Sequence, residues 1–274
     1  MRLFISSILI ALILCEAAFV CGCIASDEND AQNTTSTPAA GNDPILVYCG
    51  AGMRVPMEEI GKAFEEKTGI PVIYNFAGSG HLLAQMELTK KGDVYLPGAT
   101  MDFEEAKAKG FVAEEAKLAY HVPVIVTPKG NPSGIESLED LTKTGTRLVL
   151  GDPEAMPLGK LGEQIFTKAG IKDEVNKNVI GRRTTANELV TDILLGQADA
   201  SIIWEELYDP EKMEIIHIPN EMNVIKVVPV GTLTFSKQPE TAKMFIEFVK
   251  SDDGGKTIFA KHGFIIYPND KYEI

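Results

Sequence analysis

The chain has 274 residues, roughly the length of two domains, and its apolar fraction of 45% and charged fraction of 24% are typical of a globular protein. Its 39 acidic and 26 basic residues give a formal net charge of −13. This balance argues against a nucleic-acid or anionic-membrane surface, since both require clustered Lys and Arg. Three of the four cysteines fall in the first 23 residues and the histidines lack ligand spacing, so neither a disulfide framework nor a resident metal centre is expected.

Residues 1–23 have the features of an export signal. Arg2 precedes an apolar run of 13 residues, which is the length of a signal-peptide core and shorter than the ~20 residues of a membrane-spanning helix. The end of this segment, Val20-Cys21-Gly22-Cys23, resembles a lipobox, in which cleavage leaves Cys23 as the lipid-carrying first residue. The alternative is an uncleaved anchor helix. Both place the remaining chain outside the cell membrane, anchored to its outer face.

Residues 24–43 are predicted to form a flexible tether. They contain few large apolar side chains and no Lys or Arg, so they cannot bury enough surface to offset the entropy of ordering. Asn33 begins an N-glycosylation sequon, and the sequence leaves open whether it is used.

From residue 44 on, short apolar strands alternate with helical stretches, which predicts an α/β protein with a largely parallel sheet. The first block is expected to contain strands at 45–49, 72–76 and 93–96 and helices at 56–67 and 81–90. The second is expected to contain strands at 123–126, 147–150, 201–204 and 224–228, followed or separated by helices at 160–168, 184–195, 239–250 and 255–261.

Four turns between a strand and a helix are rich in small residues: 50–52, 78–80, 157–159 and 184–186. Helix N-termini offer unpaired N–H groups and the positive end of the helix dipole. Several such turns facing one cleft would bind an anion without any basic side chain. The alternative interpretation is that they are ordinary strand–helix loops.

The sequence around these turns resembles the molybdate-binding proteins of ABC uptake systems, the ModA type, within the type II periplasmic-binding-protein fold. The resemblance covers residues 45–268 and rests on VYCGAGMRVPMEEI (47–60), NFAGSGHLLAQ (75–85) and GDPEAMPLG (151–159). It implies two lobes, each a mixed, mostly parallel sheet flanked by helices, with the ligand between them. Lobe I would comprise 44–121 plus 232–274 and lobe II 122–231, joined by crossings near Tyr120-His121 and Gly231-Thr232.

The family holds a tetrahedral oxyanion with backbone amides and hydroxyls, and the resemblance assigns five positions to that site: Gly52, Ser79, Leu158, Ala186 and Trp204. Only Ser79 keeps a hydroxyl. Gly52, Leu158 and Ala186 could donate backbone N–H groups, while Trp204 offers one indole N–H where many members have a Tyr. Nearby hydroxyl and guanidinium groups could compensate for the missing donors; these belong to Thr184, Thr185, Arg182, Arg183 and Arg54. Alternatively, the adjacent arginines form a solvated loop.

Some relatives, particularly archaeal ones, add carboxylate ligands that make the bound metal six-coordinate. Asp152, Glu154 and Glu205 are candidates for such ligands, although Asp152 and Glu154 also fit a helix-capping turn. Tetrahedral and six-coordinate binding both remain open, as does the choice between molybdate and tungstate.

The resemblance implies a monomeric, extracytoplasmic binding protein that delivers molybdate or tungstate to an ABC permease and its ATPase, with no cofactor. A second interpretation keeps the fold and changes the ligand to sulfate, phosphate, another oxyanion or a small organic acid. An enzyme built on Ser79 and His81 is disfavoured, because residues i and i+2 at a helix start do not face each other.

Overall fold

The computed structural model describes residues 43–98 and 100–272. The expected signal peptide, the lipidation site Cys23, the sequon at Asn33 and nearly all of the tether lie outside this range. None of the helices within it combines the length and the apolar character that crossing a membrane would require.

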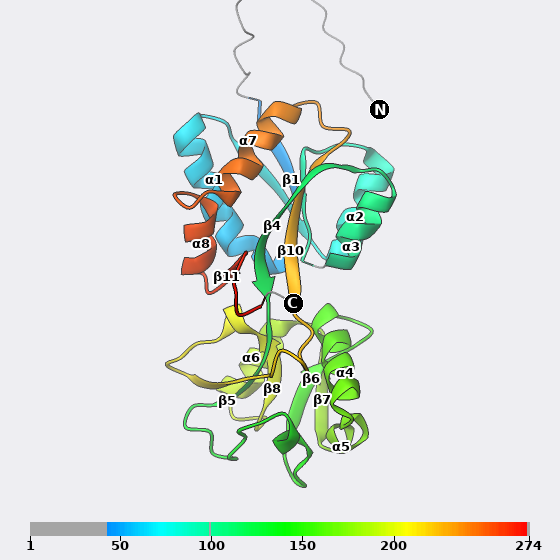
Figure 1. Ribbon diagram of the computed structural model, residues 1–274, viewed down its shortest axis with the longest axis vertical. Helices are drawn as coiled ribbons and strands as arrows, with labels where there is room; N and C mark the ends of the chain where they lie inside the picture. The colour runs from blue at the N-terminus through cyan, green and yellow to red at the C-terminus, as the bar shows by residue number, and fades with distance from the viewer. Residues whose placement is uncertain (1–42, 99, 273–274) are drawn as a thin grey trace, which may run out of the picture. The chain divides into compact units, whose positions relative to one another are not determined.

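A six-stranded sheet forms the first region, with strands in the order β11-β4-β10-β3-β1-β2 (Figure 1). Its strands are β1 (Ile45–Gly50), β2 (Val72–Ala77), β3 (Val94–Leu96), β4 (Val112–His121), β10 (Lys226–Leu233) and β11 (Ile265–Ile266). The neighbours β2, β1 and β3 are parallel, whereas β10 pairs antiparallel with β3 and β4, and β11 antiparallel with β4.

Helices cover both faces of this sheet (Figure 1). On one face lie α1 (Arg54–Thr68), α7 (Pro239–Lys250) and α8 (Gly255–Lys261); on the other lie α2 (Ser79–Thr89) and α3 (Thr100–Ala108). The first face packs through aromatic rings such as Phe64 and Phe245, whose centroids are 5.1 Å apart in an edge-to-face arrangement. The second buries Leu82, Met86 and Phe103.

The second region contains two smaller sheets around one core. Strands β5 (Pro123–Pro128), β8 (Ser201–Trp204) and β9 (Met213–His217) form an antiparallel sheet in the order β8-β5-β9, and β6 (Leu148–Gly151) and β7 (Val179–Arg183) form a parallel pair. Helices α4 (Pro157–Ala169), α5 (Lys172–Lys177) and α6 (Ala186–Leu194) accompany them, and three 3₁₀ turns complete the described elements: η1 (Ala51–Met53), η2 (Glu139–Thr142) and η3 (Glu205–Leu207).

The chain passes between the two regions at several points. Only Val122 separates β4 from β5, and β10 belongs to the six-stranded sheet over its whole length. Near the C-terminus the chain returns to the second region. Tyr272 is buried in the hydrophobic core of that region and packs against the ring of Tyr120.

Most expected elements are confirmed, and three helices, α1, α2 and α4, start two or three residues earlier than expected. The helices α7 and α8 have the predicted bounds, with Pro239 in the first turn, where a missing N–H is harmless. Helix α2 begins at Ser79 and α4 at Pro157, so the predicted turn residues are first-turn residues of helices. The sheets are mixed as expected, but antiparallel pairs are more numerous than the strand–turn–helix pattern indicated, because β4, β9, β10 and β11 return against their neighbours.

Candidate functional site

Ser79 lies where the sequence placed it, between a strand and the start of a helix. Gly78, in an extended conformation, is the N-cap of α2 and provides no side-chain cap. The helical hydrogen bonds begin with the Leu82 N–H donating to the Gly78 carbonyl at 3.1 Å. The N–H groups of Ser79 and its two successors therefore have no acceptor within the helix. Together with the half-buried Ser79 hydroxyl they form a cluster of neutral donors.

Gly52 lies in η1, between β1 and α1, and is exposed. A Cβ built on Gly52 would meet nothing within 4 Å, so the space that a serine would need is open. Gly52 therefore lacks the hydroxyl donor of a serine although a serine side chain would fit at this position.

Leu158 has a buried side chain that belongs to the core, so only its backbone can serve a ligand. The N-cap of α4 is Met156, whose carbonyl accepts hydrogen bonds from Gly159 at 3.1 Å and Lys160 at 3.4 Å. Pro157 has no N–H, and the Leu158 N–H precedes the first helical hydrogen bond. A Cβ on Gly159 would collide with the Asp152 carbonyl, which explains why the first turn of α4 requires glycine at this position.

Asp152 belongs to this turn as a structural residue. Its carboxylate accepts the Glu154 N–H at 2.8 Å, its N–H donates to the Arg183 carbonyl at 2.8 Å, and its carbonyl accepts two further N–H groups. Asp152 therefore stabilises a local turn in which Glu154 is exposed. It does not cap α4 as the sequence suggested, because the N-cap of α4 is Met156 and has no side-chain cap hydrogen bond.

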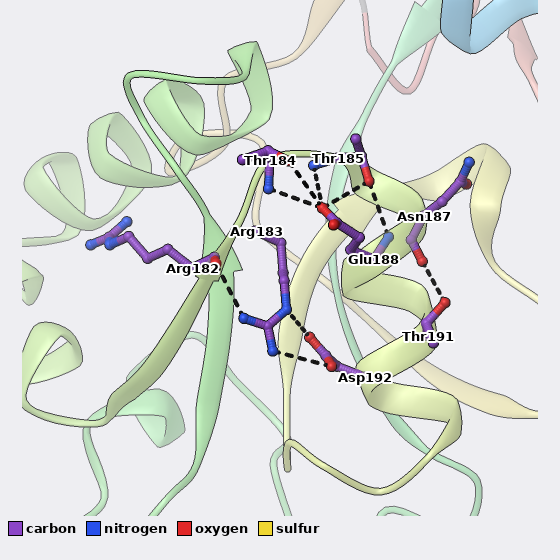
Figure 2. Close-up of polar contacts among 8 residues, drawn as sticks. All are labelled: Arg182, Arg183, Thr184, Thr185, Asn187, Glu188, Thr191 and Asp192. Atoms are coloured by element: carbon purple, nitrogen blue, oxygen red, sulfur yellow. Dashed lines mark hydrogen bonds and ion pairs between the residues drawn. The ribbon is translucent and has the colours of Figure 1, made fainter.

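Ala186 is the first residue of α6, directly after the N-cap Thr185. Figure 2 shows that the Glu188 carboxylate turns back onto this helix start and gathers the donors that precede it. Its Oε2 accepts the N–H and hydroxyl of Thr184 at 3.1 and 3.2 Å and those of Thr185 at 2.9 and 3.0 Å. The hydroxyls of Thr184 and Thr185, expected as compensating donors, are therefore already bonded to an internal anion.

This arrangement is a capping box, since the Thr185 hydroxyl also accepts the Glu188 N–H. Hydrogen bonds from Thr185 and then Thr184 hold the pKa of Glu188 below its usual range. What remains at this helix start is the backbone N–H of Ala186, the donor that the resemblance assigned.

The two adjacent arginines are fixed by carboxylates. Arg183 forms an ion pair with Asp192, with its Nε 2.7 Å from Oδ2, and Figure 2 shows its side chain pointing away from Thr184. Arg182 donates to Glu163 Oε1 at 2.7 Å and to the Gly151 carbonyl at 3.1 Å. Burial alone would raise the pKa of Glu163, but hydrogen bonds from Lys172 and Arg182 outweigh it and lower that pKa. Neither arginine is a solvated loop residue.

Arg54 is the third expected cation. It is exposed, its Nη1 lies 3.2 Å from Glu58 Oε1, and its guanidinium carbon lies 4.1 Å above the Phe76 ring. All three arginines near the predicted site thus carry a carboxylate partner among the described residues. Among the residues that the sequence assigned to the site, the donors left uncommitted are neutral groups.

Trp204 closes β8, at the end of the strand as expected, and is half-buried. Glu205 follows it and is engaged on both carboxylate oxygens, by His217 Nε2 at 3.1 Å and by the Tyr272 hydroxyl at 3.4 Å. In the part of the chain that the structure describes, no group of three or more His, Cys, Asp or Glu side chains is arranged to hold a metal ion.

Asp102 lies beside the start of α2, and the sequence analysis assigned it no role. It lies in the first turn of α3, and its Oδ1 would be 4.0 Å from a Cβ on Gly80, beside the start of α2. Burial raises the pKa of Asp102, Glu105 raises it further, and Lys160 of α4 opposes both.

Two open pockets lie elsewhere in the second region. One of about 620 Å³ is lined by residues that include Asp152, Lys160, Lys172 and Arg182, and another of about 510 Å³ by residues that include Arg147 and Lys177. None of the five predicted oxyanion residues lines either pocket. Four of the five instead share one local geometry, the start of a helix or 3₁₀ turn after a strand.

A family model for bacterial extracellular solute-binding proteins matches residues 45–265. A protein of Haemophilus influenzae assigned as a binding protein is 31% identical over 226 residues, covering 81% of this chain and 90% of that protein. The molybdate-binding protein ModA of Mycobacterium bovis is 27% identical over 255 residues, covering 92% of this chain and 95% of ModA.

Among solved structures, the substrate-binding domain assigned to a molybdenum ABC transporter of Clostridium difficile matches with a TM-score of 0.72 at 19% identity, covering 81% of this chain and 98% of that domain. The structural match supports the expected fold, and the sequence matches confirm the resemblance to ModA-type proteins.

Proposed function

Since this chain belongs to the bacterial extracellular solute-binding proteins, we propose that it captures molybdate or tungstate and delivers it to an ABC permease with its ATPase. The ligand is a transported solute, and the protein needs no cofactor. Relatives named ModA that match most of the chain support this choice of solute.

The chemistry of the helix starts is the observation that carries the proposal. At α2, α4 and α6, backbone N–H groups precede the first helical hydrogen bond, and Ser79 adds a hydroxyl. The nearby arginines Arg182 and Arg183 are held in ion pairs by Glu163 and Asp192. An oxyanion that carries no proton at neutral pH suits such a site, because all its oxygens accept hydrogen bonds. The positive ends of several helix dipoles also stabilise its negative charge.

We propose that the two regions are the lobes of the binding protein and that the oxyanion lies between them. The resemblance implies the ranges 44–121 plus 232–274 and 122–231 for these lobes. Because residues 226–231 of β10 pair with β3 and β4 in the six-stranded sheet, we move the second boundary from Gly231-Thr232 to just before Lys226. The ligand contacts are Gly52 and Ser79 from the first lobe and Leu158, Ala186 and Trp204 from the second. Closure of the lobes around the anion is the state that the permease would recognise.

Cys23 is proposed as the lipidated first residue of the mature protein, which acts as a monomer outside the cell membrane. Residues 24–43 would then tether the binding domain to the anchor.

One observation favours a ligand other than molybdate or tungstate, either sulfate or a small organic acid. Gly52 lacks the serine hydroxyl and leaves the space of that hydroxyl open. Calorimetric titration with molybdate, tungstate and sulfate side by side tests which oxyanion the protein binds. Binding of molybdate or tungstate at least tenfold tighter than sulfate supports the proposal, and the reverse order rejects it.

A further inference from the structure

A buried histidine–glutamate pair lies behind Trp204, outside the five predicted contact residues. His121 ends β4, and its Nδ1 is 2.6 Å from Oε1 of Glu206 in η3. The two side chains are only 8% and 7% exposed. Buried polar groups of this kind are costly unless they are paired, so each of the two requires the other.

The imidazole ring of His121 also contacts the ring of Trp204. Their centroids are 4.8 Å apart with an interplanar angle of 34°, and the Phe264 ring lies 5.6 Å from the imidazole on another segment. Three parts of the chain that are distant in sequence therefore meet at His121: the end of β4, the end of β8 and the segment after α8.

The backbone around Trp204 is fixed by the same segments. The Glu205 N–H donates to the carbonyl of Val122, the residue after His121, at 2.9 Å. On the other side, a Cβ on Gly263 would lie 3.1 Å from the Glu206 carbonyl oxygen, so the turn before Phe264 packs directly on η3. The segment 204–206 is thus held where the chain passes from one region to the other.

We propose that His121, held by Glu206, is a positioning residue that orients the indole of Trp204 toward the ligand. The link from Trp204 to the ligand rests on the proposed function; the orientation of the ring by His121 does not.

Trp204 is the single tryptophan of the chain, so its fluorescence reports on this site alone. The test measures indole emission and anisotropy without ligand, and then molybdate and tungstate affinity, for the wild type and the double variant His121→Phe/Glu206→Leu. The double variant keeps a ring beside Trp204 and removes both buried polar partners, which avoids leaving one of them unpaired. Glu206→Gln is the conservative variant, and His217→Phe is the matched control, because His217 pairs with Glu205 but is 46% exposed.

In the double variant we expect a shifted emission maximum and altered anisotropy. The affinity should be about 3- to 10-fold weaker, less than for complete loss of a hydrogen bond to a charged group, because the indole N–H is displaced and not removed. The single variant Glu206→Gln should keep the indole fluorescence and the affinity close to those of the wild type. His217→Phe should leave the fluorescence and the affinity unchanged. Unchanged emission and anisotropy in the double variant would overturn the proposal even if the wild type bound neither anion. Altered emission with wild-type affinity would overturn the link from Trp204 to the ligand.

Discussion

At the scale of single residues, Ser79 is the position on which the proposed site depends most. Ser79→Ala removes the hydroxyl and keeps the backbone N–H groups at the start of α2. Hydrogen bonds to charged groups contribute roughly 1.5–3 kcal/mol, so the affinity for molybdate or tungstate should fall about 10- to 150-fold in a calorimetric titration. His81→Ala is the control, because His81 is exposed on the same helix turn. Wild-type affinity in Ser79→Ala together with weakened binding in His81→Ala would place the anion elsewhere.

Arg183 should matter for stability and not for binding. Its guanidinium is 34% exposed and pairs with Asp192, whose side chain is only 7% exposed. Arg183→Met would leave a buried carboxylate without its partner, at a cost of about 3 kcal/mol, near the lower end for such pairs because of the partial exposure. Denaturant unfolding should show this loss, while the oxyanion affinity stays within about twofold. Arg54→Met, at an exposed pair, serves as the control for stability. A large loss of oxyanion affinity in Arg183→Met would instead indicate that the Arg183 guanidinium binds the ligand.

At the scale of elements, the start of α6 depends on the charge of Glu188. Hydrogen bonds from Thr185 and Thr184 lower the pKa of Glu188 from its ordinary value near 4.5. A carboxyl with a lowered folded-state pKa stabilises the protein above its unfolded-state pKa, and this contribution disappears as the pH falls through the folded-state value. The melting temperature of Glu188→Gln should therefore lie below that of the wild type by a constant amount from pH 7 to 5. Below about pH 4.5 the gap should narrow. A gap that is independent of pH down to pH 3 would contradict a role for the ionised carboxylate.

At the scale of the whole molecule, ligand binding should stabilise the folded protein. A ligand that binds only the folded state at a thousandfold excess over its Kd contributes about 4 kcal/mol, which for a domain of this size is roughly 8–16 °C in melting temperature. Differential scanning calorimetry with molybdate or tungstate should show this shift, and chloride at equal ionic strength should not. An equal shift with sulfate would favour the alternative ligand.

The proposed lipid anchor at Cys23 is tested with the protein expressed in cells with residues 1–23 present. Cys23→Ser removes the thiol that would carry the lipid, so the protein should move from washed membranes to the soluble fraction. The measurement is an immunoblot of the two fractions, with Cys49→Ser as the control because Cys49 is buried in β1. Retention of Cys23→Ser in membranes would instead support an uncleaved anchor helix.

The local pattern of residues determined most helices and strands and the types of turn between them. Apolar spacing and terminal signals identified α1 and α7, because Gly69 ends the first helix at φ 74° and Pro239 opens the second. The same pattern identified the strand-to-helix turns that carry Ser79, Leu158 and Ala186. Such features depend on neighbours within a few residues, which is why the sequence displays them.

The tertiary structure decided what depends on distant partners. The segment VAEEAKLAYH of β4 is rich in Ala, Glu and Lys, which are depleted in strands, and its conformation is set by pairing with β10 and β11 on its two sides. The partners of Arg182 and Trp204 also come from other elements: Glu163 lies 19 residues from Arg182, and His121 is contributed by β4. Residue types alone made the arginines look available to an anion. The fold gives each a carboxylate, because a partly buried charge is stable only when a partner of opposite charge lies beside it.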